Sequence, residues 1–206
     1  MLLTIHPDNP QEHKLDEAVK CLRSGGVIIY PTDTIYAIGC DINHQKAVER
    51  MAKIKGVKID QANFSLVCYD LSHLSSYAKQ IDTATFKLMK RALPGPFTFI
   101  LPASREVPRL FTTKKKTIGI RVPANDIARA LVLKLGNPIV STSVHDDDEV
   151  LEYTTDPELI HERYMDKVDM VISSGFGSNI ASTVFDCTGE VAVVIRHGAG
   201  EVEGLL

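Results

Sequence analysis

The chain has 206 residues, of which 44% are hydrophobic and 24% are charged, and its formal net charge is −3. Intrinsically disordered chains combine few hydrophobic residues with a high net charge, so this composition excludes that class and is typical of a globular protein. A net charge this small does not indicate a nucleic-acid or membrane partner by itself.

The sequence contains no linker, internal repeat or low-complexity tract, so we expect one domain over residues 1–206. No apolar run approaches the roughly 20 residues that a membrane helix needs. The N-terminus also lacks the basic and apolar regions of a signal peptide. Four widely spaced cysteines fit reduced thiols. We therefore expect a soluble, cytoplasmic protein.

The N-terminal half predicts helices that alternate with buried strands. Leu15, Ala18 and Leu22 recur at helical spacing, and Gly25-Gly26 ends that helix. Val27–Tyr30 then reads as a buried strand that ends at Pro31. Further along we expect a helix over Gln45–Lys55, a strand over Phe64–Cys68, and helices over Ser72–Lys79 and Asp82–Ala92.

The C-terminal half is richer in strands. Asn125 is expected to cap a helix that carries Ile127, Leu131 and Leu135. Strands are expected over Phe97–Leu101, Ile118–Val122, Pro138–Ser141, Met170–Ser173, Thr183–Cys187 and Ala192–Arg196. Because two pairs of these strands follow each other without a helix between them, the pattern predicts an α/β protein with a mixed sheet.

Common motifs for phosphate, dinucleotide and metal binding are absent. There is no G-x-x-x-x-G-K-[ST] loop, no dinucleotide fingerprint, no H-E-x-x-H and no C-x-x-C. The run His145–Asp148 has ligands that suit a hard cation, but consecutive side chains rarely converge on one ion. A solvated acidic turn is the simpler interpretation, so no metal site is predicted.

Hydroxyl and guanidinium side chains stand where apolar strands meet loops. They are Thr32 and Thr34, Thr117 and Arg121, Ser141, Thr142 and Ser143, Ser182 and Thr183, and Arg196. Strand ends are rigid, so side chains at several of them can converge on one ligand. Two arginines among hydroxyls suit an anion such as a carboxylate or a phosphate.

These residues lie in segments that resemble the YrdC/YciO family of threonylcarbamoyl-AMP synthases, most closely its YciO branch. The resembling segments are Pro31–Asp41, Pro94–Thr98, Thr117–Pro123, Ser141–Ser143, Ser182–Val184 and Arg196–Gly198. They follow the family order and cover nearly the whole chain.

The resemblance implies a twisted open mixed sheet with flanking helices and a concave basic cavity. It also implies a nucleotidyltransferase reaction in which L-threonine, bicarbonate and ATP with Mg²⁺ give threonylcarbamoyl-AMP and pyrophosphate for tRNA modification. By motif match, Thr34, Arg121, Ser141 and Ser182 would hold threonine or its carbamate. The nucleotide would be contacted by Thr117, Ser143 and Arg196, and its triphosphate would be neutralised by Lys53 and Lys55. The residues expected to act in catalysis are Lys53, Lys55 and Ser143.

Three positions depart from the family pattern, all on the expected nucleotide side. Lys55 stands where the family has arginine, which removes the planar fork that grips phosphate oxygens. His145 stands where the family has asparagine, and Ala37 where it has glycine.

Three functions therefore remain open from the sequence. The first is a synthase of threonylcarbamoyl-AMP, and the second is a non-catalytic protein that binds double-stranded RNA or tRNA. The RNA reading would use a basic face formed by Lys53, Lys55, Lys58 and Lys114–Lys116. The third is a sensor of an amino acid or a nucleotide. The sequence gives no oligomeric state.

Overall fold

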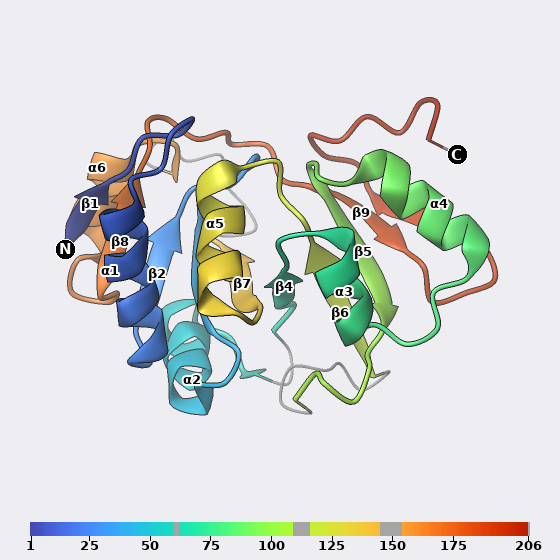
Figure 1. The fold of residues 1–206 in the computed structure, drawn as a ribbon, viewed down its shortest axis with the longest axis horizontal. Coiled ribbons are helices and arrows are strands. Elements are labelled where there is room, and N and C mark those ends of the chain that lie inside the picture. The colour runs from blue at the N-terminus through green and yellow to red at the C-terminus, as the bar shows by residue number, and fades with distance from the viewer. Residues whose placement is uncertain (60–61, 109–115, 145–153, 206) are drawn as a thin grey trace.

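The computed structural model describes residues 1–59, 62–108, 116–144 and 154–205. In chain order its first elements are β1 (Leu2–Thr4), α1 (Glu12–Arg23), β2 (Val27–Tyr30), β3 (Ala37–Asp41), α2 (Gln45–Ile54), β4 (Ser65–Val67), α3 (Leu71–Tyr77) and α4 (Thr83–Ala92). They are followed by β5 (Phe97–Pro102), β6 (Thr117–Arg121), α5 (Asp126–Leu135), β7 (Ile139–Ser143), α6 (Pro157–Tyr164), β8 (Met170–Ser173), β9 (Thr183–Asp186) and β10 (Val193–Arg196) (Figure 1).

The helix ends follow ordinary capping chemistry. The Asn125 side chain accepts a hydrogen bond from the Ala128 backbone N–H, which confirms the predicted N-cap of α5. Asp82 caps α4 in the same way, accepting from the N–H groups of Ala84 and Thr85. At the other end of α5, Gly136 has a φ of 86°, a left-handed conformation that glycine adopts without strain.

The ten strands of the described residues form a single sheet in the order β1-β8-β2-β3-β7-β4-β6-β5-β9-β10. Neighbouring strands pair in both directions: β4 with β6 and β5 with β9 are parallel, whereas β2 with β3, β5 with β6 and β9 with β10 are antiparallel. The prediction of a mixed sheet is therefore confirmed. No helix among the described residues has the length and apolar character needed to cross a membrane.

Elements β1, β3 and α6 are not among those predicted from the sequence. Strand β3 was missed because Gly39 interrupts its apolar run, yet the fold requires glycine there. A Cβ at Gly39 would lie 2.5 Å from the Ile139 side chain and 2.8 Å from the Tyr30 ring. Helix α6 carries two ordinary start signals, Asp156 as its N-cap and Pro157 in its first turn.

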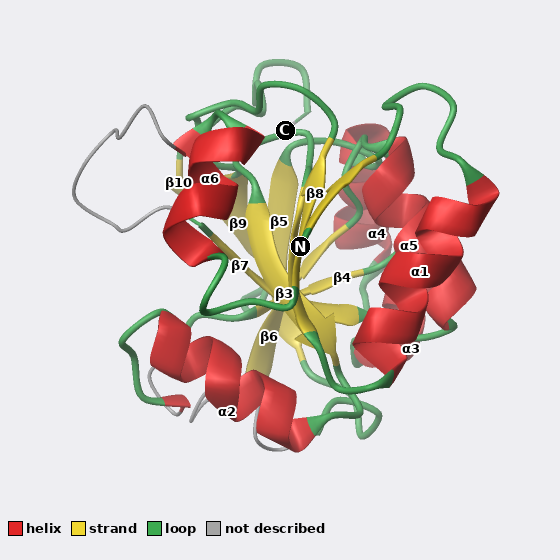
Figure 2. Cartoon of the chain, turned by 90° about the vertical axis from the view of Figure 1, so that its left-hand side faces the viewer, coloured by secondary structure: helices red, strands yellow, loops and turns green. Residues whose placement is uncertain are grey.

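Helices cover the sheet on both sides (Figure 2), with α1, α3, α4 and α5 on one side of the molecule and α2 and α6 on the other. In β5, Phe97, Phe99 and Leu101 belong to the core that also contains residues of α3 and α4. Thr98 and Ile100 alternate with them and therefore face the other way, into a cavity. Strand alternation thus gives β5 one core face and one cavity face.

Candidate functional site

The cavity has a volume of about 480 Å³, within the range of small-molecule sites. It is lined from β3, β4, β5, β6, β7, β9 and β10 and from the segment that joins α2 to β4. The charged residues of its described lining are all basic: Lys55, Arg121 and Arg196. Hydroxyl groups surround them, from Thr34, Thr98, Thr117, Ser65, Ser141, Thr142, Ser143 and Ser182. Such a lining suits an anionic ligand.

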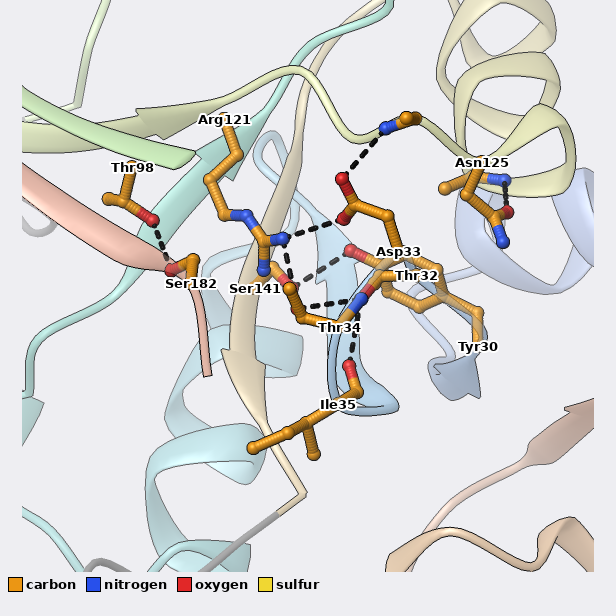
Figure 3. Close-up of polar contacts among 12 residues, drawn as sticks. Tyr30, Thr32, Asp33, Thr34, Ile35, Thr98, Arg121, Asn125, Ser141 and Ser182 are labelled. Carbon is orange, nitrogen blue, oxygen red and sulfur yellow. Dashed lines mark hydrogen bonds and ion pairs between the residues drawn. The ribbon is translucent and has the colours of Figure 1, made fainter. Parts of the chain in front are cut away.

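We call Thr34, Arg121 and Ser141 the Arg121 wall of the cavity. Arg121 Nη2 donates to Asp33 Oδ1 at 2.8 Å and to Thr34 Oγ1 at 3.0 Å (Figure 3). The second carboxylate oxygen of Asp33 accepts from the Ala124 backbone N–H at 2.9 Å. Through these bonds Asp33, in the turn after β2, connects that turn to Arg121 at the end of β6 and to Ala124 in the turn that follows β6. The Arg121 Nε atom is buried, and no described residue accepts its proton.

Behind the Arg121 wall lies a buried tyrosine. Tyr30 is fully buried, and its hydroxyl donates to Ser141 Oγ at 2.8 Å. Burial raises the pKa of Tyr30 to about 12, despite the opposing effect of the Ser141 hydrogen bond. Tyr30 therefore keeps its proton at neutral pH.

We call Thr98, Ser182 and Arg196 the Arg196 wall. Arg196 donates from Nε and Nη2 to the Ser182 carbonyl oxygen at 3.1 and 2.9 Å, and from Nη2 to Ser182 Oγ at 3.1 Å. Ser182 Oγ also lies 2.8 Å from Thr98 Oγ1. These bonds attach β10, the last strand of the sheet, to the beginning of β9 and orient Arg196 at the cavity.

The fold brings together eight of the residues that the sequence marked as candidates. Thr34, Lys55, Thr117, Arg121, Ser141, Ser143, Ser182 and Arg196 all line the cavity. Lys53 does not: it is exposed in the last turn of α2, outside the described lining. His145, Lys114 and Lys115 lie outside the residues that the structure describes.

The sequence did not assign roles to Asp33, Tyr30 or Thr98. Asp33 lies within the quoted Pro31–Asp41 motif, and a carboxylate next to a predicted ligand residue was a usable signal. Its partner Arg121 is 88 positions away, and the partner of Tyr30 is 111 positions away. Pairings over such distances are decided by the fold.

The described residues of the cavity do not fit a protein-bound metal. The described lining contains no carboxylate, and the described parts of the chain contain no group of three or more His, Cys, Asp or Glu able to hold an ion. Mg²⁺ in proteins usually takes one or two carboxylates in addition to substrate phosphates. Any Mg²⁺ that accompanies a nucleotide here would thus depend on the phosphate oxygens.

Comparison of the sequence with known proteins identifies a family and several relatives. The family model for Sua5, YciO and YrdC, described as telomere recombination, matches residues 20–198. The chain is 47% identical over 204 residues to the uncharacterised protein YciO of Escherichia coli K12, covering 98% of this chain and 97% of the relative. It is 32% identical over 163 residues to threonylcarbamoyl-AMP synthase of Coxiella burnetii, covering 79% of this chain and 86% of that protein.

Solved structures give the same result. The crystal structure of E. coli YciO superposes with a TM-score of 0.92 and 45% identity, covering 100% of this chain and 99% of that one. Sua5 of Pyrococcus abyssi, crystallised with L-threonine, superposes with a TM-score of 0.86 and 28% identity, covering 96% of this chain but 57% of that one. The twisted mixed sheet with flanking helices is therefore the YrdC fold, and the chain belongs to the Sua5/YciO/YrdC family.

Proposed function

We propose that this protein forms threonylcarbamoyl-AMP from L-threonine, bicarbonate and ATP. The activity is the one after which its relatives, the threonylcarbamoyl-AMP synthases, are named. The observation that carries the proposal is the cavity itself. It gathers Lys55, Arg121 and Arg196 with a set of hydroxyls, and its described lining holds no carboxylate that would repel a triphosphate. The Sua5 structure with L-threonine supports the amino acid as one ligand of this fold.

The chemistry needs positioning and positive charge more than a protein nucleophile. The threonine amine and bicarbonate give a carbamate and water. A carbamate oxygen then attacks the α-phosphorus of ATP, the bond to the β-phosphate breaks, and pyrophosphate leaves with its electron pair. Reactants held close together in a cationic cavity gain from orientation and from neutralised phosphate charge. The cavity side chains can supply both.

We assign a role to each candidate residue of the cavity; the threonine side consists of the Arg121 wall together with Ser182 of the Arg196 wall. Thr34, Arg121, Ser141 and Ser182 would hold threonine or its carbamate, since they offer a guanidinium among hydroxyls. Arg196, Thr117 and Ser143 would contact the nucleotide, and Lys55 would lie against the triphosphate. Lys53 is exposed outside the lining, so any contribution to phosphate binding would be indirect. The product would serve tRNA modification.

The direct test is to incubate purified protein with ATP, Mg²⁺, labelled bicarbonate and L-threonine. We expect pyrophosphate and a labelled adenylate above a protein-free blank, and we expect both to depend on threonine. Arg121→Ala should abolish both. If wild-type protein yields neither product, the proposal is wrong.

RNA binding remains the alternative. Lys53 and Lys58, both exposed, flank the part of the cavity lining that contains Lys55 and Val57. If this face binds duplex RNA, affinity should fall steeply as salt rises, because phosphate contacts release counterions. Undetectable or salt-independent binding would exclude this alternative.

A further inference from the structure

Ser141 in the Arg121 wall keeps a proton that it can give to a ligand. The Tyr30 hydroxyl donates to Ser141 Oγ at 2.8 Å, so Ser141 is the acceptor in that bond. A hydroxyl has one proton and two acceptor positions. No described residue accepts the remaining Ser141 proton. Ser141 therefore faces the cavity as a donor, the polarity that an anionic oxygen requires.

Thr34, in the same wall, has the opposite polarity. Thr32 Oγ1 donates to the Ile35 carbonyl oxygen at 2.8 Å, which uses its single proton. Thr32 Oγ1 also lies 3.1 Å from Thr34 Oγ1, and in that pair Thr34 must be the donor. Arg121 Nη2 donates to Thr34 Oγ1 at 3.0 Å and occupies one acceptor position. Thr34 is left with one acceptor position and no proton to give.

We propose that Tyr30 and Thr32, neither of which lines the cavity, are positioning residues that fix the hydrogen-bond direction of Ser141 and Thr34. Ser141 then recognises an anionic oxygen, and Thr34 recognises an N–H group. The ligand class is an α-amino acid or its N-carboxy derivative, held with its nitrogen at Thr34 and a carboxylate oxygen at Ser141. This inference rests on the proposed function and assigns the polarity of its amino-acid subsite.

The Arg121 wall also explains why the hydroxyls of Ser141 and Thr34 are not interchangeable. Arg121 alone would attract any anion, because a guanidinium has donors and no acceptor. Adding one hydroxyl locked as a donor and one locked as an acceptor distinguishes a zwitterion from a simple carboxylate. A buried polar group that is left unpaired weakens binding of the wrong ligand.

The test compares three ligands by isothermal titration calorimetry: L-threonine, L-threoninol, which lacks the carboxylate, and 3-hydroxybutanoate, which lacks the amine. Loss of one hydrogen bond to a charged group corresponds to about a tenfold weaker affinity. Tyr30→Phe should weaken L-threonine by about that factor and leave L-threoninol within twofold. Thr32→Val should weaken L-threonine similarly and leave 3-hydroxybutanoate within twofold.

Two controls separate positioning from a general loss of structure. Tyr164→Phe removes another buried tyrosine hydroxyl, one that donates to the Val144 carbonyl oxygen at 3.3 Å, and should change no affinity. In a Ser141→Ala background, Tyr30→Phe should have no further effect, because its action passes through Ser141. Equal losses for all three ligands, or additive losses in the double variant, would overturn the inference.

Neutron diffraction from deuterium-exchanged crystals without ligand tests the polarity directly. We expect a deuteron on Tyr30 directed at Ser141 Oγ and one on Thr34 directed at Thr32 Oγ1. Either deuteron in the reverse direction would overturn the inference whether or not threonine binds. If the deuterons lie as expected but wild-type protein binds no L-threonine, then the proposed function is wrong and the assigned ligand with it.

Discussion

The two walls of the cavity hold their arginines in different ways. Arg121 is paired with a carboxylate, and the side chains of Arg121 and Asp33 are 13% and 8% exposed. Arg196 instead donates to a backbone carbonyl and a serine hydroxyl, and it stands exposed on the last strand of the sheet. The first arrangement builds the arginine into the fold, whereas the second presents it at an edge. Loss of the ion pair at the Arg121 wall should therefore cost stability in addition to ligand binding, whereas changes at the Arg196 wall should cost binding alone.

The largest effect is expected for Asp33→Ala. Removing one partner of an ion pair that is mostly shielded from solvent leaves the other charge uncompensated, so the free energy of unfolding should fall by about 3 kcal/mol. Urea unfolding followed by circular dichroism measures the loss. Arg50→Ala is the matched control, since its 2.6 Å ion pair with Asp169 has side chains 41% and 40% exposed. Exposed pairs contribute about 1 kcal/mol or less. Equal losses in the two variants would refute the distinction between the walls.

Arg196→Ala should affect binding and spare the fold. Losing hydrogen bonds to a charged phosphate corresponds to roughly a ten- to hundredfold weaker ATP affinity. L-Threonine should bind within about threefold of wild type, and unfolding should change by less than about 1 kcal/mol. Calorimetric titration of each ligand measures this. Lys87→Ala, which removes an exposed positive charge from α4, should leave both affinities unchanged. Comparable losses for ATP and threonine would show that the nucleotide role of Arg196 is wrong.

The smallest expected effect is the difference in ATP affinity between variants of two neighbouring lysines, Lys53 and Lys55. Lys55 lines the cavity and Lys53 does not. A single charge about 4 Å from a phosphate in water is worth about 1 kcal/mol, so Lys55→Ala should weaken ATP about fivefold. Lys53→Ala should stay within twofold. Competition with a fluorescent nucleotide measures both, and a larger loss for Lys53 would contradict the cavity lining described above.

Much of this site was predictable because its residues carry local signals. The apolar run Val27–Tyr30 predicted a buried strand, and the hydroxyls and arginines at several strand ends predicted convergence on an anion. Alternation along β5 and the cap at Asn125 also follow from neighbouring residues. The assignment of one domain to the whole chain and the catalytic roles of the lining residues stay predictions.

What the sequence determined by itself was therefore most of the strands, their polar ends and the family they resemble, since each depends on residues close together in the chain. The tertiary structure decided which of these groups meet. It paired Arg121 with Asp33 and Tyr30 with Ser141, over 88 and 111 positions, and it left Lys53 outside the cavity while Lys55 lines it. The physical reason is that strand order and register, rather than local propensity, set which side chains lie within hydrogen-bonding distance.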